Sequence, residues 1–135
     1  MKKACVLGAG IMGSGIAQVV AAAGFEVIMR DIEDRFVEKG LATIKFHLDR
    51  AVEKEKIEAE TATRIMARIE GTTDISKAVA EADFVIEAVV EEMRVKKELF
   101  SELDVICKPE TILASNTSGL SITEIGSVTG RPDKV

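Results

Sequence analysis

The feature that most constrains this 135-residue chain is a glycine-rich turn close to its N-terminus. A short apolar run at residues 4–7 leads directly into Gly8, Gly10 and Gly13, and an apolar stretch with helical spacing begins within the same segment. Glycine tolerates tight turns and close backbone contacts that other residues resist. A buried strand that turns at once into a helix is the opening unit of a parallel α/β sheet. The turn therefore predicts that class of fold.

The rest of the chain alternates between short runs rich in valine and isoleucine and longer stretches with helical spacing. The predicted strands are residues 4–7, 27–29, 84–88 and 112–114, with a further short strand at 71–73. This alternation is typical of βα units around a parallel sheet whose strands are buried on both faces. We predict a doubly wound, mainly parallel, Rossmann-like sheet.

A longer helical region interrupts the alternation after the second strand. Apolar residues recur at steps of three and four from Val37 to Val52 and again from Ile57 to Ile69, and charged residues 53–56 separate the two stretches. We predict an inserted helical hairpin between the second and third strands, with no strand inside residues 37–69. The other predicted helices are residues 11–23 with Gly24 as C-cap, a helix from about Val95 to Ile106, and a short helix that begins at the capping box Ser121–Glu124.

Each glycine of the first turn has a physical role in a dinucleotide-binding fold. Gly8 permits the tight turn, Gly10 lets a pyrophosphate approach the backbone, and Gly13 lets the helix lie close to the sheet. The amides at the start of the helix then face the phosphates, helped by the helix dipole. A glycine-rich turn without a ligand is the alternative, but the strand before it and the apolar helix after it favour dinucleotide binding.

Asp31 ends the second predicted strand, where dinucleotide-binding folds place an acid. Its carboxylate can accept hydrogen bonds from both ribose hydroxyls of an adenosine; the alternative is a solvated residue that caps the following helix. A negative charge here disfavours the 2′-phosphate of NADP, so we predict NAD. Arg30 and Arg35 complicate this prediction, because a nearby arginine is how NADP is accommodated. Strand alternation places Arg30 on the face opposite Asp31.

Two later strands deliver polar groups to the same edge of the predicted sheet. The strand at residues 84–88 runs into Glu91 and Glu92, and the strand at 112–114 runs into the Ser-Asn-Thr-Ser-Gly segment 115–119. Ligands of open α/β sheets bind outside the carboxyl ends of the strands. A surface turn without function is the alternative for residues 115–119.

Charge and composition exclude several other classes of protein. The net charge of −5 argues against general nucleic-acid binding, and the longest apolar stretch is too short to span a bilayer. Cys5 and Cys107 lack metal-type spacing, so we expect small buried residues in a reducing cytoplasm and no metal site. The first residues lead directly into a strand, so we expect no signal peptide.

Three motifs in order resemble the N-terminal domain of 3-hydroxyacyl-CoA dehydrogenases, over essentially the whole chain. They are residues 8–13, the VIEAVVEE and KKELF segments, and ASNTSGLSI. The resemblance implies that the following residues bind NAD: Gly8, Gly10, Ile11, Met12, Gly13, Asp31, Glu91 and Lys96. It further implies that the acyl-CoA substrate is contacted by Lys54, Asn116 and Ser118, and that Ser118 assists catalysis. The alternative for Lys54 is an exposed lysine in a charged turn, and for Lys96 it is a solvated helix face beside Lys97.

The resemblance also implies a reaction, hydride transfer between an (S)-3-hydroxyacyl-CoA and NAD to give the 3-oxoacyl-CoA. Oxidising an alcohol requires a base, and the family uses a histidine of a His-Phe-Phe-Asn-Pro type motif paired with a glutamate. This chain lacks that motif, and its only histidine, His47, is expected to be structural or exposed. We therefore expect residues 1–135 to be a truncated NAD-binding domain, inactive alone, without the helical C-terminal domain that completes the substrate pocket and forms a homodimer.

Two other functions remain open at this point. One is another NAD-dependent 2- or 3-hydroxyacid dehydrogenase that shares the glycine turn. The other is a non-catalytic module that senses NAD and switches a partner. The turn that contains Asn116 and Ser118 argues against both, because neither function explains that group of side chains beside a nicotinamide.

Overall fold

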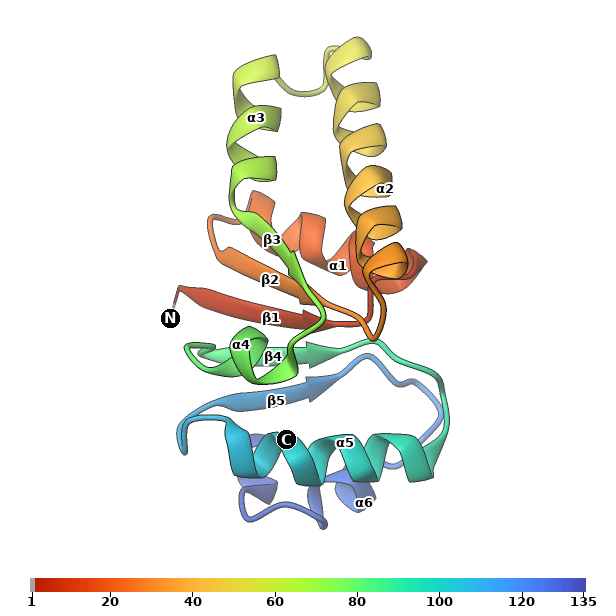
Figure 1. The fold of residues 1–135 in the computed structure, drawn as a ribbon, viewed down its shortest axis with the longest axis vertical. Coiled ribbons are helices and arrows are strands. Elements are labelled where there is room, and N and C mark those ends of the chain that lie inside the picture. The colour runs from red at the N-terminus through yellow and green to blue at the C-terminus, as the bar shows by residue number, and fades with distance from the viewer. Residues whose placement is uncertain (1) are drawn as a thin grey trace.

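The computed structural model describes residues 2–135 and contains one five-stranded sheet in which every neighbouring pair is parallel (Figure 1). The strand order is β3-β2-β1-β4-β5. The strands are β1 (Lys3–Leu7), β2 (Glu26–Arg30), β3 (Ile69–Thr72), β4 (Phe84–Glu87) and β5 (Ile112–Ser115). The order changes direction between β1 and β4, which is the topological switch point where such sheets bind ligands.

Helices cover both faces of the sheet, as the alternating periodicities predicted. They are α1 (Ile11–Ala22), α2 (Asp34–Glu53), α3 (Ala59–Ala67), α4 (Ile75–Val79), α5 (Met93–Ile106) and α6 (Ile122–Gly126), followed by the short 3₁₀ helix η1 (Pro132–Lys134). Val6 and Met29 belong to one core with α1, α2 and α3. Leu7 belongs to the other core with Phe100 and Leu103 of α5, and burial of each of these two α5 side chains stabilises the fold by roughly 2–3 kcal/mol.

The predicted helical hairpin is present between β2 and β3. Val37, Ile44 and Leu48 form the buried stripe of α2, and Ala62 and Ile65 are the buried residues of α3. The charged segment forms the turn between the helices, where Glu55 takes a positive φ of 57°. In Figure 1 the two helices extend away from the strands on the β3 side, whereas α5 and α6 lie on the β5 side. None of the helices in residues 2–135 is long and apolar enough to cross a membrane.

One expectation about local structure was wrong, and one short helix was not anticipated. Ile69 was assigned to the second hairpin helix, but that helix ends at Ala67 and Ile69 begins β3, so a strand does enter residues 37–69 at the last position. Ile69 lies four residues after Ile65 and therefore fits a helical period. Both side chains lie in the same core. A short strand buries the Ile69 side chain as well as one more turn of helix would. The five-residue helix α4 was not predicted, because it is too short to show a period.

Candidate functional site

The carboxyl ends of the strands lie in register along one edge of the sheet. Leu7 pairs with Arg30 on one side and with Glu87 on the other, and Glu87 pairs with Ser115. The residues that follow these strand ends also lie side by side. For example, the Gly8 N–H donates to the Arg30 carbonyl at 2.8 Å. The glycine turn, Asp31, the segment after β4 and the segment after β5 therefore leave the sheet at one level and share one edge.

The glycine turn has the shape that the sequence predicted. Gly8 has a φ of +110°, and a Cβ there would lie 2.5 Å from the Ala88 carbonyl oxygen. A Cβ on Gly13 would overlap the carbonyl oxygen of Gly8, so α1 approaches the turn as closely as its backbone allows. A Cβ on Gly10 would meet no atom within 4 Å. The turn thus leaves open space at the position where a pyrophosphate is expected to approach.

The N-terminus of α1 is free to bind an anion. Its N-cap residue, Gly10, supplies no side-chain hydrogen bond, and the first turn of this 12-residue helix contains no acidic residue. By contrast, Asp74 and Ser121 cap α4 and α6 with their own side chains. The first-turn amides of α1, together with the positive end of the helix dipole, can therefore face a phosphate. The site fits the pyrophosphate of a dinucleotide.

Asp31 lies beside this turn and is oriented by it. One carboxylate oxygen accepts the N–H of Ala9 at 2.9 Å and the other accepts the N–H of Ile32 at 2.7 Å. Each oxygen keeps a further lone pair for a ribose hydroxyl. Glu33, rather than Asp31, is the N-cap residue of α2, so Asp31 does not cap that helix. Arg30 has a different partner, the Thr73 carbonyl at 3.0 Å.

A cleft of about 410 Å³ opens next to Asp31. Its lining comes from the glycine turn, the start of α2 and the segment after β4: Ala9, Gly10, Ile11, Asp31, Ile32, Phe36, Lys39, Thr43 and Val90. A groove of about 470 Å³ at the opposite, amino-terminal edge includes Arg68 and Lys77. Because ligands of open α/β sheets bind at the carboxyl ends of the strands, the cleft beside Asp31 is the candidate site for an adenosine.

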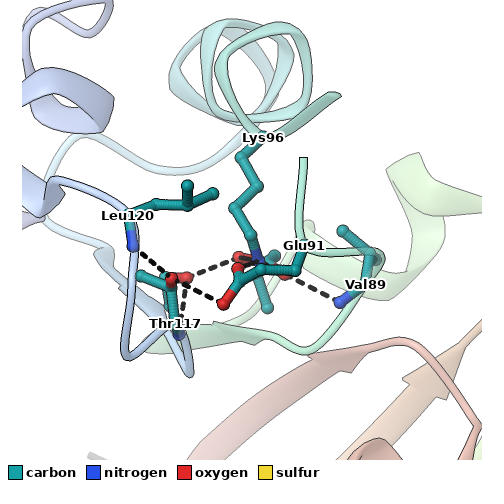
Figure 2. A network of polar contacts seen from close by, with 7 residues as sticks. Val89, Glu91, Lys96, Thr117 and Leu120 are labelled. Carbon is teal, nitrogen blue, oxygen red and sulfur yellow. Dashed lines mark hydrogen bonds and ion pairs between the residues drawn. The ribbon is translucent and has the colours of Figure 1, made fainter. Parts of the chain in front are cut away.

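The second half of the site contains a buried ion pair (Figure 2). Lys96 Nζ of α5 lies 2.7 and 2.6 Å from the two carboxylate oxygens of Glu87 at the end of β4, and neither side chain has any exposed surface. Glu87 also accepts the N–H of Val89 at 2.7 Å and the hydroxyl of Ser115 at 2.6 Å. Lys96 is therefore not on a solvated face.

The other predicted site residues lie at the surface. Asn116 and Ser118 are exposed on the segment after β5, and the Asn116 N–H donates to the Glu87 carbonyl at 3.0 Å. Glu91, half exposed, lies 3.4 Å from Lys96. Lys54 is exposed in the hairpin turn, on a different part of the molecule from the strand ends. His47 is exposed on α2, with its ring edge-on to Phe46.

Sequence reasoning missed the residues that hold this half together: Glu87, Ser115 and Thr117. A signal was available, because Glu87 lies two residues after Val85 in a buried strand, and alternation places both on one face. Lys96 lies four residues before Phe100, on the buried stripe of α5. An acid and a base that both fall on apolar faces predict a buried pair.

The two cysteines play no part in the site. Both are free, and both are buried, which is how they were expected to lie. Burial, reinforced by Cys107, raises the pKa of the Cys5 thiol to about 12, and burial raises that of Cys107 to about 11. Neither thiol is a nucleophile at neutral pH.

Together, the glycine turn, the uncapped start of α1, Asp31 and the switch point define a dinucleotide-binding domain of the kind that dehydrogenases use. Residues 3–135 match the family described as 3-hydroxyacyl-CoA dehydrogenase, NAD binding domain, and the chain belongs to that family. NAD is the cofactor of this domain. The resemblance inferred from the three motifs is thereby confirmed.

Relatives and solved structures agree with this assignment. The chain is 48% identical over 135 residues to a probable 3-hydroxybutyryl-CoA dehydrogenase of Bacillus subtilis (strain 168), matching all of this chain and 47% of that protein. It is 44% identical over 133 residues to a 3-hydroxybutyryl-CoA dehydrogenase of Clostridioides difficile, covering 98% of this chain and 47% of the relative. The crystal structure of (S)-3-hydroxybutyryl-CoA dehydrogenase PaaH1 from Ralstonia eutropha superposes with a TM-score of 0.95 at 40% identity, over 99% of this chain and 47% of that one. The chain thus spans about half the length of these proteins.

Proposed function

We propose that this chain is the cofactor-binding half of an NAD-dependent 3-hydroxyacyl-CoA dehydrogenase that interconverts an (S)-3-hydroxyacyl-CoA and its 3-oxoacyl-CoA. One observation supports this best. The glycine turn with Asp31 and the segment with Asn116 and Ser118 leave the same edge of the sheet, on either side of the switch point between β1 and β4. A dinucleotide that crosses this point has its adenosine in the cleft beside Asp31 and its nicotinamide near β4 and β5.

The residues divide into two groups in this proposal. Gly8, Gly10, Ile11, Met12 and Gly13 hold the pyrophosphate through the backbone at the start of α1. Asp31 binds the adenosine ribose. This half of the site therefore relies on amides and one carboxylate, which are groups that bind phosphate and hydroxyls without a metal ion.

The second group acts at the nicotinamide end. When bound, NAD supplies the acceptor for the hydride that leaves C3 of the substrate. Ser118 and Asn116 lie exposed beside this end, and we assign them to the substrate oxygen, where the Ser118 hydroxyl donates a hydrogen bond to the reacting oxygen. We assign Glu91 and Lys96, whose charged groups lie 3.4 Å apart at this end, to NAD.

The hairpin supplies a third group, for coenzyme A. Lys54 lies at the turn, and Arg50 and Phe46 lie four and eight residues before it on the same stripe of α2. The Arg50 guanidinium lies 5.6 Å from the Phe46 ring centroid. Two cations with an exposed aromatic ring suit an adenine nucleotide with phosphates. We assign Lys54 to these phosphates.

We also propose that the enzyme acts in the cytoplasm and forms a homodimer through residues outside this chain. The share of the relatives that the chain matches, 47%, leaves room for a second domain that completes the substrate pocket. The histidine needed as base is one group we assign to that part, since His47 lies exposed on α2.

The test is a fluorescence titration of the chain with NADH, followed by an assay with acetoacetyl-CoA. The chain contains no tryptophan or tyrosine, so changes in NADH emission are easy to interpret. We expect saturable NADH binding and no turnover by this chain alone. Turnover at the rate of an ordinary dehydrogenase would show that these 135 residues contain a base, and absence of NADH binding would refute the cofactor site.

The coenzyme A assignment is tested separately with Lys54→Ala. Removing one exposed lysine from a phosphate is expected to weaken coenzyme A binding about two- to fivefold, with NADH binding unchanged. Lys56→Ala is the matched control, because Lys56 is exposed in the same turn. Equal effects of the two changes would reduce Lys54 to a general surface charge.

A further inference from the structure

The first half of α2 lies against the glycine turn, and a buried glycine makes this close approach possible (Figure 1). Gly40 lies well inside α2, on its buried stripe. Glycine is a poor helix former, so helix stability alone does not explain a glycine here. A Cβ on Gly40 would lie 2.7 Å from the Ala9 carbonyl oxygen and 3.0 Å from the Ala9 Cβ. The helix therefore approaches the turn as closely as its backbone allows.

The obstacle at Gly40 is the backbone of the turn, which is held in place. Ala9 is buried, and its N–H donates to Asp31 at 2.9 Å. Its carbonyl and its methyl group face Gly40, so Ala9 is fixed on two sides. The remaining atom near a Cβ at position 40 is Met29 Cε at 2.9 Å, which ends a flexible side chain and can rotate away. A larger residue at position 40 would therefore displace α2 rather than the turn.

The same part of α2 forms one wall of the cleft beside Asp31. The residues that line the cleft from α2 are Phe36, Lys39 and Thr43. They lie within about one helical turn of Gly40, and the glycine turn forms the opposite wall. Contact between packed surfaces weakens steeply with distance, since a gap of about 0.5–1 Å forfeits roughly a quarter to a half of the dispersion energy. The close approach at Gly40 therefore sets the width of the cleft.

We propose that Gly40 is a positioning residue for the cofactor: by letting α2 lie against the glycine turn, it places the α2 wall of the cleft in contact with the adenosine of NAD. This inference rests on the proposed function, which puts the adenosine in this cleft. A methyl group at position 40 widens the cleft and removes no group that contacts the ligand. It therefore weakens the binding of any ligand that carries the adenosine.

Calorimetric titration with ADP-ribose tests this, because ADP-ribose carries the adenosine and lacks the nicotinamide. In Gly40→Ala we expect the affinity to fall about five- to tenfold, the effect of a loosened wall. Gly71→Ala is the matched control. A Cβ on Gly71 would also press on α2, but it would meet the side-chain ends of Val37 and Leu41 rather than backbone. We expect Gly71→Ala to lower Tm and to keep ADP-ribose affinity within about twofold of the unmodified protein.

A double-mutant cycle with Phe36 separates positioning from a general loss of stability. Phe36 is half-buried and lines the cleft, so Phe36→Ala should fold and should by itself weaken ADP-ribose binding about three- to tenfold. If Gly40 acts through this wall, adding Gly40→Ala to Phe36→Ala should cost only about a further twofold. A purely structural effect of Gly40→Ala would be additive and would keep its full size in that background.

The outcomes are distinct. A loss of ADP-ribose affinity in Gly40→Ala that shrinks in the Phe36→Ala background, with Gly71→Ala unchanged, supports the positioning role. Unchanged affinity in Gly40→Ala, an equal loss in Gly71→Ala, or full additivity in the cycle would overturn it. Unchanged affinity in Phe36→Ala would overturn it independently, even if Gly40→Ala misfolds, because the wall would then not contact the adenosine. If the unmodified protein bound neither ADP-ribose nor NADH, the proposed function itself would fail.

Discussion

Three glycines of the first βα unit separate folding from cofactor binding. A Cβ on Gly13 would overlap the backbone oxygen of Gly8, whereas a Cβ on Gly10 or Gly15 would meet no atom within 4 Å. Substituting alanine at each position adds the same methyl group in three different surroundings. The expected results differ in kind, so the three variants serve as controls for one another.

The expected stabilities follow from these surroundings. In Gly13→Ala the obstacle is backbone, so α1 must shift, at a cost of about 3 kcal/mol. The gain in helix propensity offsets about 1 kcal/mol of this. With roughly 3.5 °C per kcal/mol for a domain of this size, Tm should fall by about 7 °C. Gly15→Ala, on the exposed side of α1, should raise Tm by about 2–4 °C because only the propensity changes.

Gly10→Ala should fold normally and bind NADH poorly. Its methyl group extends into the open space that the pyrophosphate is proposed to approach, so at least one charge-assisted hydrogen bond to a helix amide is lost. That is about 1.5–3 kcal/mol, or roughly a tenfold to hundredfold weaker affinity. Thermal unfolding gives the Tm values, and NADH fluorescence titration gives the affinities. Unchanged NADH affinity in Gly10→Ala would refute the placement of the pyrophosphate at this turn, as would loss of affinity in Gly15→Ala.

Three further predictions concern single side chains. The protein should prefer NADH to NADPH by at least about 30-fold, and Asp31→Ala should narrow that ratio; equal affinities in the unmodified protein would contradict the ribose assignment. Backbone N–H groups of Lys3 and Lys2 lower the pKa of Asp83 from 3.8 to about 2. The ionised Asp83 carboxylate therefore stabilises the folded state fully above about pH 4, and this contribution is lost as the pH falls through 2. In Asp83→Asn, Tm should depend less on pH between about pH 4 and pH 2. Arg131→Met should cost about 2–3 kcal/mol in unfolding experiments, because Arg131 donates to the Asp104 carboxylate at 2.8 Å and to three backbone carbonyls.

Most of the fold was predictable because its main elements have clear periods. The strand around Val6 is buried on both faces, and the strands around Met29 and Val85 are buried on one face and half-buried on the other. All three have continuous apolar runs, and α2 presents one apolar stripe. The prediction failed where an element was short. β3 has four residues and lies at the edge of the sheet, so Ile69 fitted a helical period as well as a strand.

The two halves of the site were predictable to different degrees for a physical reason. The glycine turn functions through backbone geometry, and glycine is the residue that such geometry requires, so the motif itself identifies the chemistry. The polar contacts around Lys96 and Glu87 join side chains far apart in sequence, such as Ser115 and Glu87, which are 28 residues apart. No local motif specifies contacts of that kind. Only the apolar faces on which Glu87 and Lys96 fall indicate the pair.

This difference leads to different tolerances for substitution. At the adenosine end, backbone amides are proposed to bind the phosphates, so an exposed side chain such as Met12 can change with little effect as long as Gly8, Gly10 and Gly13 remain. At the nicotinamide end, a lysine that pairs with two carboxylates cannot be replaced by arginine without enlarging a side chain that has no exposed surface. Glu91 and Thr117, on the loops after β4 and β5, share a hydrogen bond, so a substitution on one loop is expected to affect the other. Altered specificity at the nicotinamide end is therefore expected from paired substitutions on both loops, and single substitutions there are expected to impair binding first.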